Sequence, residues 1–304
     1  MTTPLPVTLI SGYLGAGKTT LVNEMLRHAA GKRIAVLVNE FGELPIDEDL
    51  IEAREDDLIS IAGGCICCSF GSDLAAALQK MAAMTPQPDH IVIEASGVAL
   101  PAAIAQTIDL LPFLRLEGIC VLADALNIQH MLRDEYIGDT IERQLSDADL
   151  IVLTKSDLVP DTGLKAVTEA LKGQWPEVPL VIAPLGKIPN AVLLGAFPQQ
   201  DARLVAPHAD GNYESVALTF NRACDAAALA EALTDPALGI LRAKGYVPEH
   251  SGKVALLQLA GRRVEVSYPS ETGHLGVICI GLKDKIALEA VKELPERTAV
   301  AMTG

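Results

Sequence analysis

The chain has 304 residues, of which half are apolar and only 4% aromatic, and its 24 basic and 39 acidic residues give a net charge of −15. This length allows two domains with separate cores, and an aliphatic composition is typical of buried parallel sheets. Because so acidic a chain repels nucleic acid and anionic lipid, we expect neither as a partner. The sequence has no basic leader and no run of about 18 uncharged apolar residues, so we expect a cytoplasmic protein without a membrane-spanning helix.

The first predicted strand, residues 5–10, leads into Gly12-Tyr13-Leu14-Gly15-Ala16-Gly17-Lys18-Thr19, and a helix is expected from about Lys18. This segment fits the phosphate-binding pattern G-x-x-x-x-G-K-[ST], in which glycines let backbone N–H groups turn toward phosphates. Lys18 can neutralise the β and γ phosphates, and the Thr19 hydroxyl can hold Mg²⁺. A glycine-rich turn without a ligand is the alternative, but such turns rarely combine these residues at this spacing. We therefore expect a nucleoside triphosphate to bind here, with Lys18 also acting in catalysis. The expected binding residues are Gly12, Gly15, Ala16, Gly17, Lys18, Thr19 and Thr20.

Short apolar runs alternate with helical patterns over the first two thirds of the chain. Strands are expected at 33–39, 90–94, 118–124, 150–154 and 180–183, and helices near 18–28, 72–84, 99–109, 140–148 and 163–172. This alternation predicts βαβ units, so we assign 1–195 to an α/β P-loop domain with a mostly parallel sheet. Ligands bind at the carboxyl ends of such strands. The segments with chemical groups all follow predicted strands, at 12–19, 39–43, 94–97 and 154–157.

Two acidic segments are placed like the phosphate-sensing switches of a nucleotide hydrolase. Glu94-Ala95-Ser96-Gly97 ends the strand 90–94, where an acidic residue can bind Mg²⁺ through water and the Gly97 N–H can contact the γ-phosphate. Asn39-Glu40-Phe41-Gly42-Glu43 follows the strand 33–39 and supplies two carboxylates, of which Glu43 is the stronger candidate. A solvated turn is the other interpretation of this loop. We expect Glu94 and Glu43 to act in catalysis, with Glu43 also a metal ligand.

Three cysteines lie within four residues in Gly63-Gly64-Cys65-Ile66-Cys67-Cys68, between the strand 33–39 and a helix expected from Ser72. Neighbouring cysteines rarely meet the geometry of a disulfide, whereas clustered thiolates suit Zn²⁺ and other late transition metals. Three thiolates leave a tetrahedral site one ligand short, and an open site favours metal delivery over a structural role. A redox pair or buried small residues are the alternatives. We expect Cys65, Cys67 and Cys68 to bind a metal ion.

Thr154-Lys155-Ser156-Asp157 follows the strand 150–154, near the place where a GTPase carries Asn-Lys-x-Asp. An aspartate here accepts hydrogen bonds from guanine N1–H and the N2 amino group, whereas adenine would leave the carboxylate unpaired. The methylene stem of Lys155 can lie along the base, while Thr154 replaces the usual Asn and removes one orienting amide. A strand-end turn with an Asx motif is the alternative. We expect Thr154, Lys155 and Asp157, together with Gly97, to bind the nucleotide.

The alternating pattern breaks after Gly195, and we interpret 196–212 as a linker. The segment 213–304 predicts a smaller α+β domain without a catalytic constellation of its own. Its expected strands are 216–220, 256–259, 264–268 and 274–280, the middle two forming a hairpin, and its expected helices are 225–233 and 283–294.

These motifs together resemble those of the CobW-like GTPases, relatives of the urease and hydrogenase maturation GTPases. The resemblance covers the P-loop, the two switch segments, the C-x-C-C motif and the Thr154–Asp157 loop, and Arg242-Ala243-Lys244-Gly245 looks like the family's R-x-K-G segment. A P-loop combined with C-x-C-C is highly specific, and the resemblance spans nearly the whole chain. It implies GTP hydrolysis coupled to metal binding and transfer, with Mg²⁺ at the nucleotide and Zn²⁺ or Co²⁺ on cysteines near it.

Two features depart from the family pattern. Val38 stands where relatives often carry a Glu, and the six histidines are scattered, without the His-rich stretch of many members. The second departure weakens a zinc-storage role. We expect a GTP-dependent metallochaperone that binds GTP or GDP and delivers its metal to a client protein that requires it. A homodimer is an alternative to a monomer.

Two other functions remain as alternatives to a metallochaperone. One is a nucleotide-switched assembly factor for a metalloenzyme that carries no metal itself. The other is a P-loop kinase that uses ATP, against which Asp157 and the lack of an arginine-bearing lid in the sequence argue.

Overall fold

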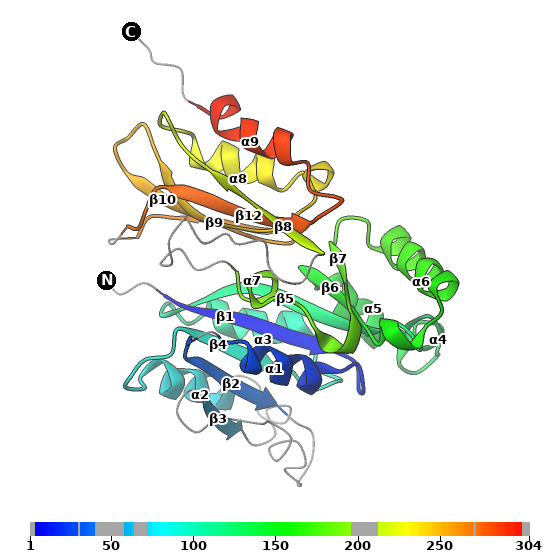
Figure 1. The fold of residues 1–304 in the computed structure, drawn as a ribbon. Helices are drawn as coiled ribbons and strands as arrows, with labels where there is room; N and C mark the ends of the chain where they lie inside the picture. Colours follow the sequence, from blue (N-terminus) through cyan, green and yellow to red (C-terminus); the bar gives the residue numbers. More distant parts are fainter. Residues whose placement is uncertain are drawn as a thin grey trace. The chain divides into compact units, whose positions relative to one another are not determined.

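The structure is a computed structural model and describes residues 4–29, 31–39, 58–63, 72–195, 212–269 and 272–299. These residues form two compact units, one from Pro4 to Asn190 and one that begins at Ala191 (Figure 1). Within the described ranges, no helix is both long and apolar enough to cross a membrane.

Seven parallel strands, among the residues described, form the sheet of the first unit in the order β3-β2-β4-β1-β5-β6-β7. Their bounds are β1 Leu5–Gly12, β2 Ile34–Asn39, β3 Leu58–Gly63, β4 His90–Glu94, β5 Leu114–Asp124, β6 Leu150–Thr154 and β7 Leu180–Ala183. The chain builds β2 to β4 on one side of β1 and β5 to β7 on the other. The loop after β1 therefore lies where the strand order reverses, which is the place where open parallel sheets bind ligands.

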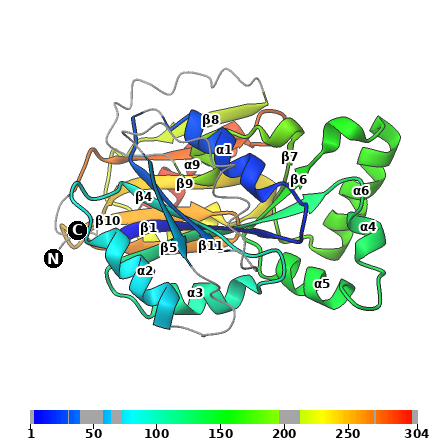
Figure 2. The same ribbon diagram turned by 90° about the horizontal axis from the view of Figure 1, so that it is seen from below.

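Helices cover both faces of this sheet, with α1 on one face and α2, α3 and α5 on the other (Figure 2). The helix bounds in this unit are α1 Lys18–Arg27, α2 Ser72–Ala82, α3 Pro101–Asp109, α4 Ile128–Met131, α5 Gly138–Ser146 and α6 Asp161–Gln174. The short helix α7 (Asn190–Leu193) lies, from Ala191 on, in the second unit. Leu78 of α2, Ile108 of α3 and Leu145 of α5 pack in one aliphatic core with side chains of the strands. Because both faces are covered, β4 and β6 are buried at every position, which explains their continuous apolar sequences.

Two observed strands are missing from the sequence prediction. β3 pairs with β2, with Gly63 opposite Asn39, so the cysteine segment follows β3. The segment lies between β2 and the helix at Ser72, as predicted, but the prediction did not include β3, because pairing between strands distant in sequence leaves no local signal in so short a run. In the second unit, β9 (Ile240–Pro248) carries Arg242 and Lys244 at alternate positions, and these charges hide its strand pattern.

The second unit is an antiparallel sheet of five strands, within the part of the chain described, in the order β11-β10-β9-β12-β8. The bounds are β8 Tyr213–Leu218, β10 Val254–Ala260, β11 Arg263–Ser267 and β12 Gly276–Leu282, with helices α8 Ala226–Leu233 and α9 Leu288–Arg297. Both helices pack on one face of the sheet (Figure 1). The predicted hairpin is β10–β11, while the predicted helix 283–294 begins late, because 283–285 form a turn. The predicted fold class, a parallel α/β domain followed by a smaller α+β domain, is confirmed.

The Arg242–Gly245 segment lies in β9 and has packing contacts. Arg242 is 3% exposed, and its guanidinium donates from Nε to the Val192 carbonyl oxygen at 2.6 Å and from Nη2 to that of Leu193. Because a helix leaves its last carbonyl groups without intrahelical partners, Arg242 caps α7. Gly245 lies so close to β12 that a Cβ would be 1.9 Å from the Gly276 carbonyl oxygen.

Replacing Gly245 with alanine is expected to lower the free energy of unfolding in urea by about 3 kcal/mol, because the opposing atoms are backbone and cannot rotate away. Gly252→Ala is the control, since φ is 78° there and a Cβ added at this position would have no neighbour within 4 Å. That variant should lose about 1 kcal/mol from backbone strain alone. Equal losses in the two variants would contradict the steric explanation.

Candidate functional site

The phosphate-binding loop runs from Gly12 to Lys18, between β1 and α1. Gly12 and Gly17 have φ values of 135° and 95°, and a Cβ at Gly12 would lie 2.5 Å from the Leu122 carbonyl oxygen, so both positions require glycine. α1 begins at Lys18, which brings its unpaired N–H groups and positive dipole end to the loop. Lys18 Nζ donates to the carbonyl oxygens of Gly12 at 2.9 Å and Tyr13 at 3.3 Å. The loop therefore offers a cation and backbone donors to a phosphate.

Thr19 and Glu94 meet beside this loop. Thr19 Oγ1 donates to Glu94 Oε1 at 2.7 Å, and Glu94 is 4% exposed at the end of β4. Parallel pairing of β4 with β1, with Glu94 opposite Ile10, brings the carboxylate to the P-loop. A hydroxyl and a carboxylate side by side are the hard oxygen ligands that Mg²⁺ prefers, so this pair fits the predicted magnesium site.

Gly97, in the loop after β4, lies against the P-loop. A Cβ at Gly97 would be 2.7 Å from the backbone nitrogen of Leu14. The Gln144 side chain of α5 is 1% exposed and donates through Nε2 to the carbonyl oxygens of Gly97 at 3.0 Å and Ala99 at 2.9 Å. Gln144 thus fixes the backbone of the predicted second switch, a function that its position in an amphipathic helix did not indicate.

Thr154 links the predicted base-binding loop to the P-loop. Its Oγ1 is 2.7 Å from the carbonyl oxygen of Ala16, to which it donates, and 3.2 Å from that of Ala123. Thr154 and Ala16 are both 3% exposed, so this hydrogen bond is shielded from water. The hydroxyl therefore gives Thr154 a positioning function, although it replaces the amide usual at this position.

Two loops with left-handed backbone surround Asp157. Lys155 and Leu185, each with φ 54°, are the non-glycine residues with positive φ in the part of the chain that the structure describes. Lys155 precedes the 3₁₀ turn Ser156–Leu158, and Leu185 lies in the turn Pro184–Gly186 after β7. The Leu185 N–H donates to Asp157 Oδ1 at 3.1 Å, which places the β7 loop against an exposed carboxylate. Such backbone outliers gather at functional sites, but the sequence carries no signal for Leu185.

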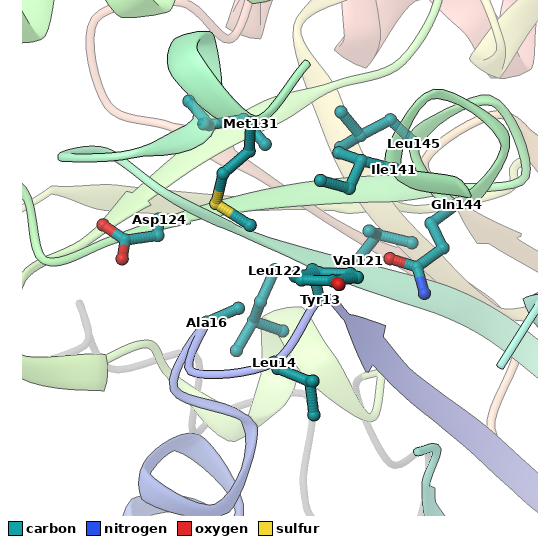
Figure 3. A pocket seen from close by; sticks show the side chains of 11 residues that line it. Tyr13, Leu14, Ala16, Val121, Leu122, Asp124, Met131, Ile141, Gln144 and Leu145 are labelled. Atoms are coloured by element: carbon teal, nitrogen blue, oxygen red, sulfur yellow. The ribbon is translucent and has the colours of Figure 1, made fainter. Parts of the chain in front are cut away.

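Asp124 ends β5 opposite Thr154 in the neighbouring β6. Its Oδ2 accepts from Lys155 Nζ at 2.8 Å and Asn127 Nδ2 at 2.9 Å, and its Oδ1 accepts from the Leu126 N–H at 2.9 Å. Burial opposes ionisation, but these hydrogen bonds and the Lys155 charge hold the pKa of Asp124 below its usual value. Figure 3 shows this carboxylate pointing away from the apolar side chains that line a small pocket beside the P-loop. The sequence indicates Asp124 only as the last residue of a strand.

The predicted ligands Cys65, Cys67 and Cys68 and the predicted switch residue Glu43 lie outside the described residues. Among the residues that are described, no group of three or more His, Cys, Asp or Glu side chains could hold a metal ion. Of the buried cysteines, Cys279 has a pKa raised to about 12 by burial, which disfavours the thiolate needed for metal binding. The metal site therefore stays a prediction from the sequence.

Thr154→Val is expected to weaken binding of GTP and GDP about fivefold to tenfold, because valine keeps the shape but leaves the buried Ala16 carbonyl without this hydrogen bond. Equilibrium titration with each nucleotide measures the change. Thr154→Ser is the matched control, since serine keeps the hydroxyl, and its affinities should stay within about twofold of the wild type. A loss in the serine variant as large as in the valine variant would contradict the proposed link.

The sequence of this chain is similar to those of known proteins. The family described as "CobW/HypB/UreG, nucleotide-binding domain" matches residues 6–181, and the "Cobalamin synthesis protein cobW C-terminal domain" matches 213–292. The chain is 31% identical to the Zinc chaperone CobW of a Sinorhizobium species over an alignment 330 residues long, gaps included, which covers 92% of this chain and 93% of that protein. It is 38% identical to the Zinc chaperone YjiA of Escherichia coli over 163 residues, covering 51% and 50% of the two chains.

A solved structure aligns over nearly the full length. It is the Zn(II)-bound YjiA GTPase from E. coli, with 22% identity, a TM-score of 0.43 and coverage of 98% of this chain and 100% of that chain. From the sequence match over more than half of its length, the chain belongs to the CobW/HypB/UreG family of P-loop GTPases.

Proposed function

We propose that this GTPase is a metallochaperone, which binds a zinc or cobalt ion at Cys65, Cys67 and Cys68 and couples GTP hydrolysis to transfer of the ion to a client protein. The observation that carries the proposal is the register of the strand ends: Gly63 of β3 pairs with Asn39 of β2, and Val38 pairs with Glu94 of β4. The C-x-C-C segment therefore begins at the carboxyl ends of the strands, on the same side of the sheet as Glu94. Three strand spacings separate β3 from β1, about 14 Å in all.

We infer that Lys18 neutralises the β and γ phosphates and that Thr19 and Glu94 hold Mg²⁺, Glu94 through water. Bound Mg²⁺ would neutralise charge that develops on the phosphates during hydrolysis. The Gly97 N–H would donate to the γ-phosphate, and Glu43 would supply a second carboxylate. The contacts of Lys18 with the loop and of Thr19 with Glu94 support these assignments. The other phosphate-binding residues in this proposal are Gly12, Gly15, Ala16, Gly17 and Thr20.

Asp157 is proposed to select guanine, with the base lying along the Lys155 stem. The exposed Asp157 carboxylate, oriented by the Leu185 N–H, supports this assignment. Guanine N1–H and N2–H₂ would both donate to the carboxylate, whereas adenine offers no matching pair of donors.

Three adjacent thiolates are proposed as soft ligands for the transported ion, and the names of the two zinc-chaperone relatives favour zinc. Free thiolates persist in reducing compartments, so we place the protein in the cytoplasm. The proposed recipient of the ion is a client protein that requires the metal. A second copy of this chain, in a homodimer, is a further proposed partner. An assembly factor without metal is the alternative function, and the metal content of the purified protein separates the two.

GTP is expected to bind at least tenfold more tightly than ATP, a difference of about 1.4 kcal/mol that a pair of hydrogen bonds from the base can supply. Asp157→Asn should reduce this ratio, because the amide replaces one of the two acceptor oxygens that face guanine N1–H and N2–H₂ with an NH₂ donor. Calorimetry with each nucleotide and Mg²⁺ measures both affinities. Asp161→Asn, at an exposed position that begins α6, is the matched control and should keep the wild-type ratio. Equal affinity of the wild type for GTP and ATP would remove the guanine assignment.

One Zn²⁺ or Co²⁺ per chain is expected, with strong thiolate-to-cobalt charge-transfer absorption. Metal affinity should fall as the pH drops, because protons compete for the thiolates. If GTP tightens metal binding tenfold, linkage requires that the metal tighten GTP binding by the same factor. An anaerobic metal-competition titration with GTP·Mg²⁺ and with GDP·Mg²⁺ measures this coupling.

The variant Cys67→Ser should lose the metal and keep nucleotide binding, because the P-loop donors are a separate set of groups. Cys224→Ser is the matched control: the Cys224 thiol is buried and donates to the Pro295 carbonyl oxygen at 3.2 Å, which a serine hydroxyl can also do. Full metal affinity in Cys67→Ser, or equal wild-type metal affinity with GTP and GDP, would overturn the coupled mechanism.

A further inference from the structure

We propose that Asp124 is a positioning residue for nucleotide binding, which holds the Lys155 ammonium so that the Lys155 stem forms a fixed wall of the base site. This inference rests on the proposed guanine site at Asp157. Asp124 reaches the nucleotide only through Lys155, because its own carboxylate oxygens are occupied by Lys155, Asn127 and the Leu126 N–H.

The geometry of Asp124 suits a fixed anchor. Its side chain is 8% exposed, and three donors from three different residues meet its two oxygens at 2.8 to 2.9 Å. The register of β5 with β6 sets Asp124 opposite Thr154, one residue before Lys155, so the sheet itself fixes the distance between the anchor and its partner. Hydrogen bonds from Asn127 and the Leu126 N–H fix the position of the Asp124 carboxylate. The ion pair with this fixed carboxylate therefore restricts the motion of the Lys155 side chain.

Lys155 is held at both ends. Its backbone has φ 54°, which lysine rarely adopts, and its ammonium is fixed by Asp124 at 2.8 Å. The side chain is still 34% exposed, so part of the stem is open to a ligand while the charged end is occupied. An unanchored lysine would have to give up its rotamer freedom when the base binds, and anchoring removes that cost beforehand.

The chemistry of this contact predicts which measurements Asp124 will change. The anchor lies at the base and not at the γ-phosphate, so its loss should weaken GTP and GDP equally. It should raise KM with a much smaller effect on kcat, because an interaction made equally in the ground state and the transition state changes binding alone. A purely structural defect would lower the active fraction and leave KM unchanged.

The test is a double-mutant cycle of Asp124→Asn and Lys155→Met on the full chain, with GTP, GDP and ATP in calorimetry and GTP in steady-state hydrolysis. Asparagine removes the charge that faces the ammonium, and methionine keeps an apolar stem without the charge. We expect Asp124→Asn to weaken GTP and GDP about tenfold, as the loss of a hydrogen bond between charged groups does, with kcat reduced less than threefold. In the Lys155→Met background, Asp124→Asn should have no further effect on affinity.

Two further variants protect the test against a folding defect. Asp124→Ser enters the same cycle, since its hydroxyl can still accept from the Leu126 N–H. Asp149→Asn is the control: Asp149 is a 5% exposed aspartate before β6 that accepts from the Ile119 N–H at 3.0 Å, and its substitution should leave both nucleotide affinities unchanged.

The outcomes separate this inference from the proposed function. If the wild type prefers GTP over ATP but the Asp124 and Lys155 effects are additive, or if Asp124→Asn changes only kcat, the positioning role of Asp124 is overturned and the guanine site stands. If the wild type does not prefer GTP, the guanine site falls and the inference falls with it. Loss of affinity in Asp149→Asn equal to that in Asp124→Asn would also overturn the assignment.

Discussion

The end of β5 supports the nucleotide site from behind. β5 lies between β1 and β6, so its last residues are within reach of both the P-loop and the base-binding loop. The Leu122 carbonyl leaves room only for a glycine at position 12, and the Ala123 carbonyl lies 3.2 Å from the Thr154 hydroxyl. Asp124 binds Lys155. Three successive residues of one strand thus fix two loops that carry different parts of the site, and a shift of β5 would move both loops together.

The charge of the chain makes such local contacts decisive. A net charge of −15 repels a nucleoside triphosphate at long range. Binding therefore has to come from hydrogen-bond donors and cations that contact the nucleotide directly at the carboxyl ends of the strands. Lys18 provides such a cation at the P-loop, where the carbonyl oxygens of Gly12 and Tyr13 hold its ammonium. Thr19 and Glu94 add oxygen ligands for a divalent cation, which would reduce the repulsion further.

Local motifs could be predicted from the sequence because the relevant residues are contiguous. The P-loop, Glu94 and the Thr154–Asp157 loop all lie at the carboxyl ends of strands as predicted, since apolar runs and glycines mark those positions directly. Leu185 and Gln144 could not be found in this way, because their contacts join segments 28 and about 45 residues apart. Such contacts depend on strand order, which the local pattern does not contain. The functions of Glu43 and the three clustered cysteines stay predictions.

The left-handed backbone of Lys155 and Leu185 sets a trade-off between stability and binding. A non-glycine residue in this conformation costs about 1–2 kcal/mol, and glycine would remove that cost at either position. At position 155, however, glycine would also remove the stem and the ammonium that Asp124 holds. The more stable protein would therefore be the poorer nucleotide binder, and selection for thermal stability alone would act against this site.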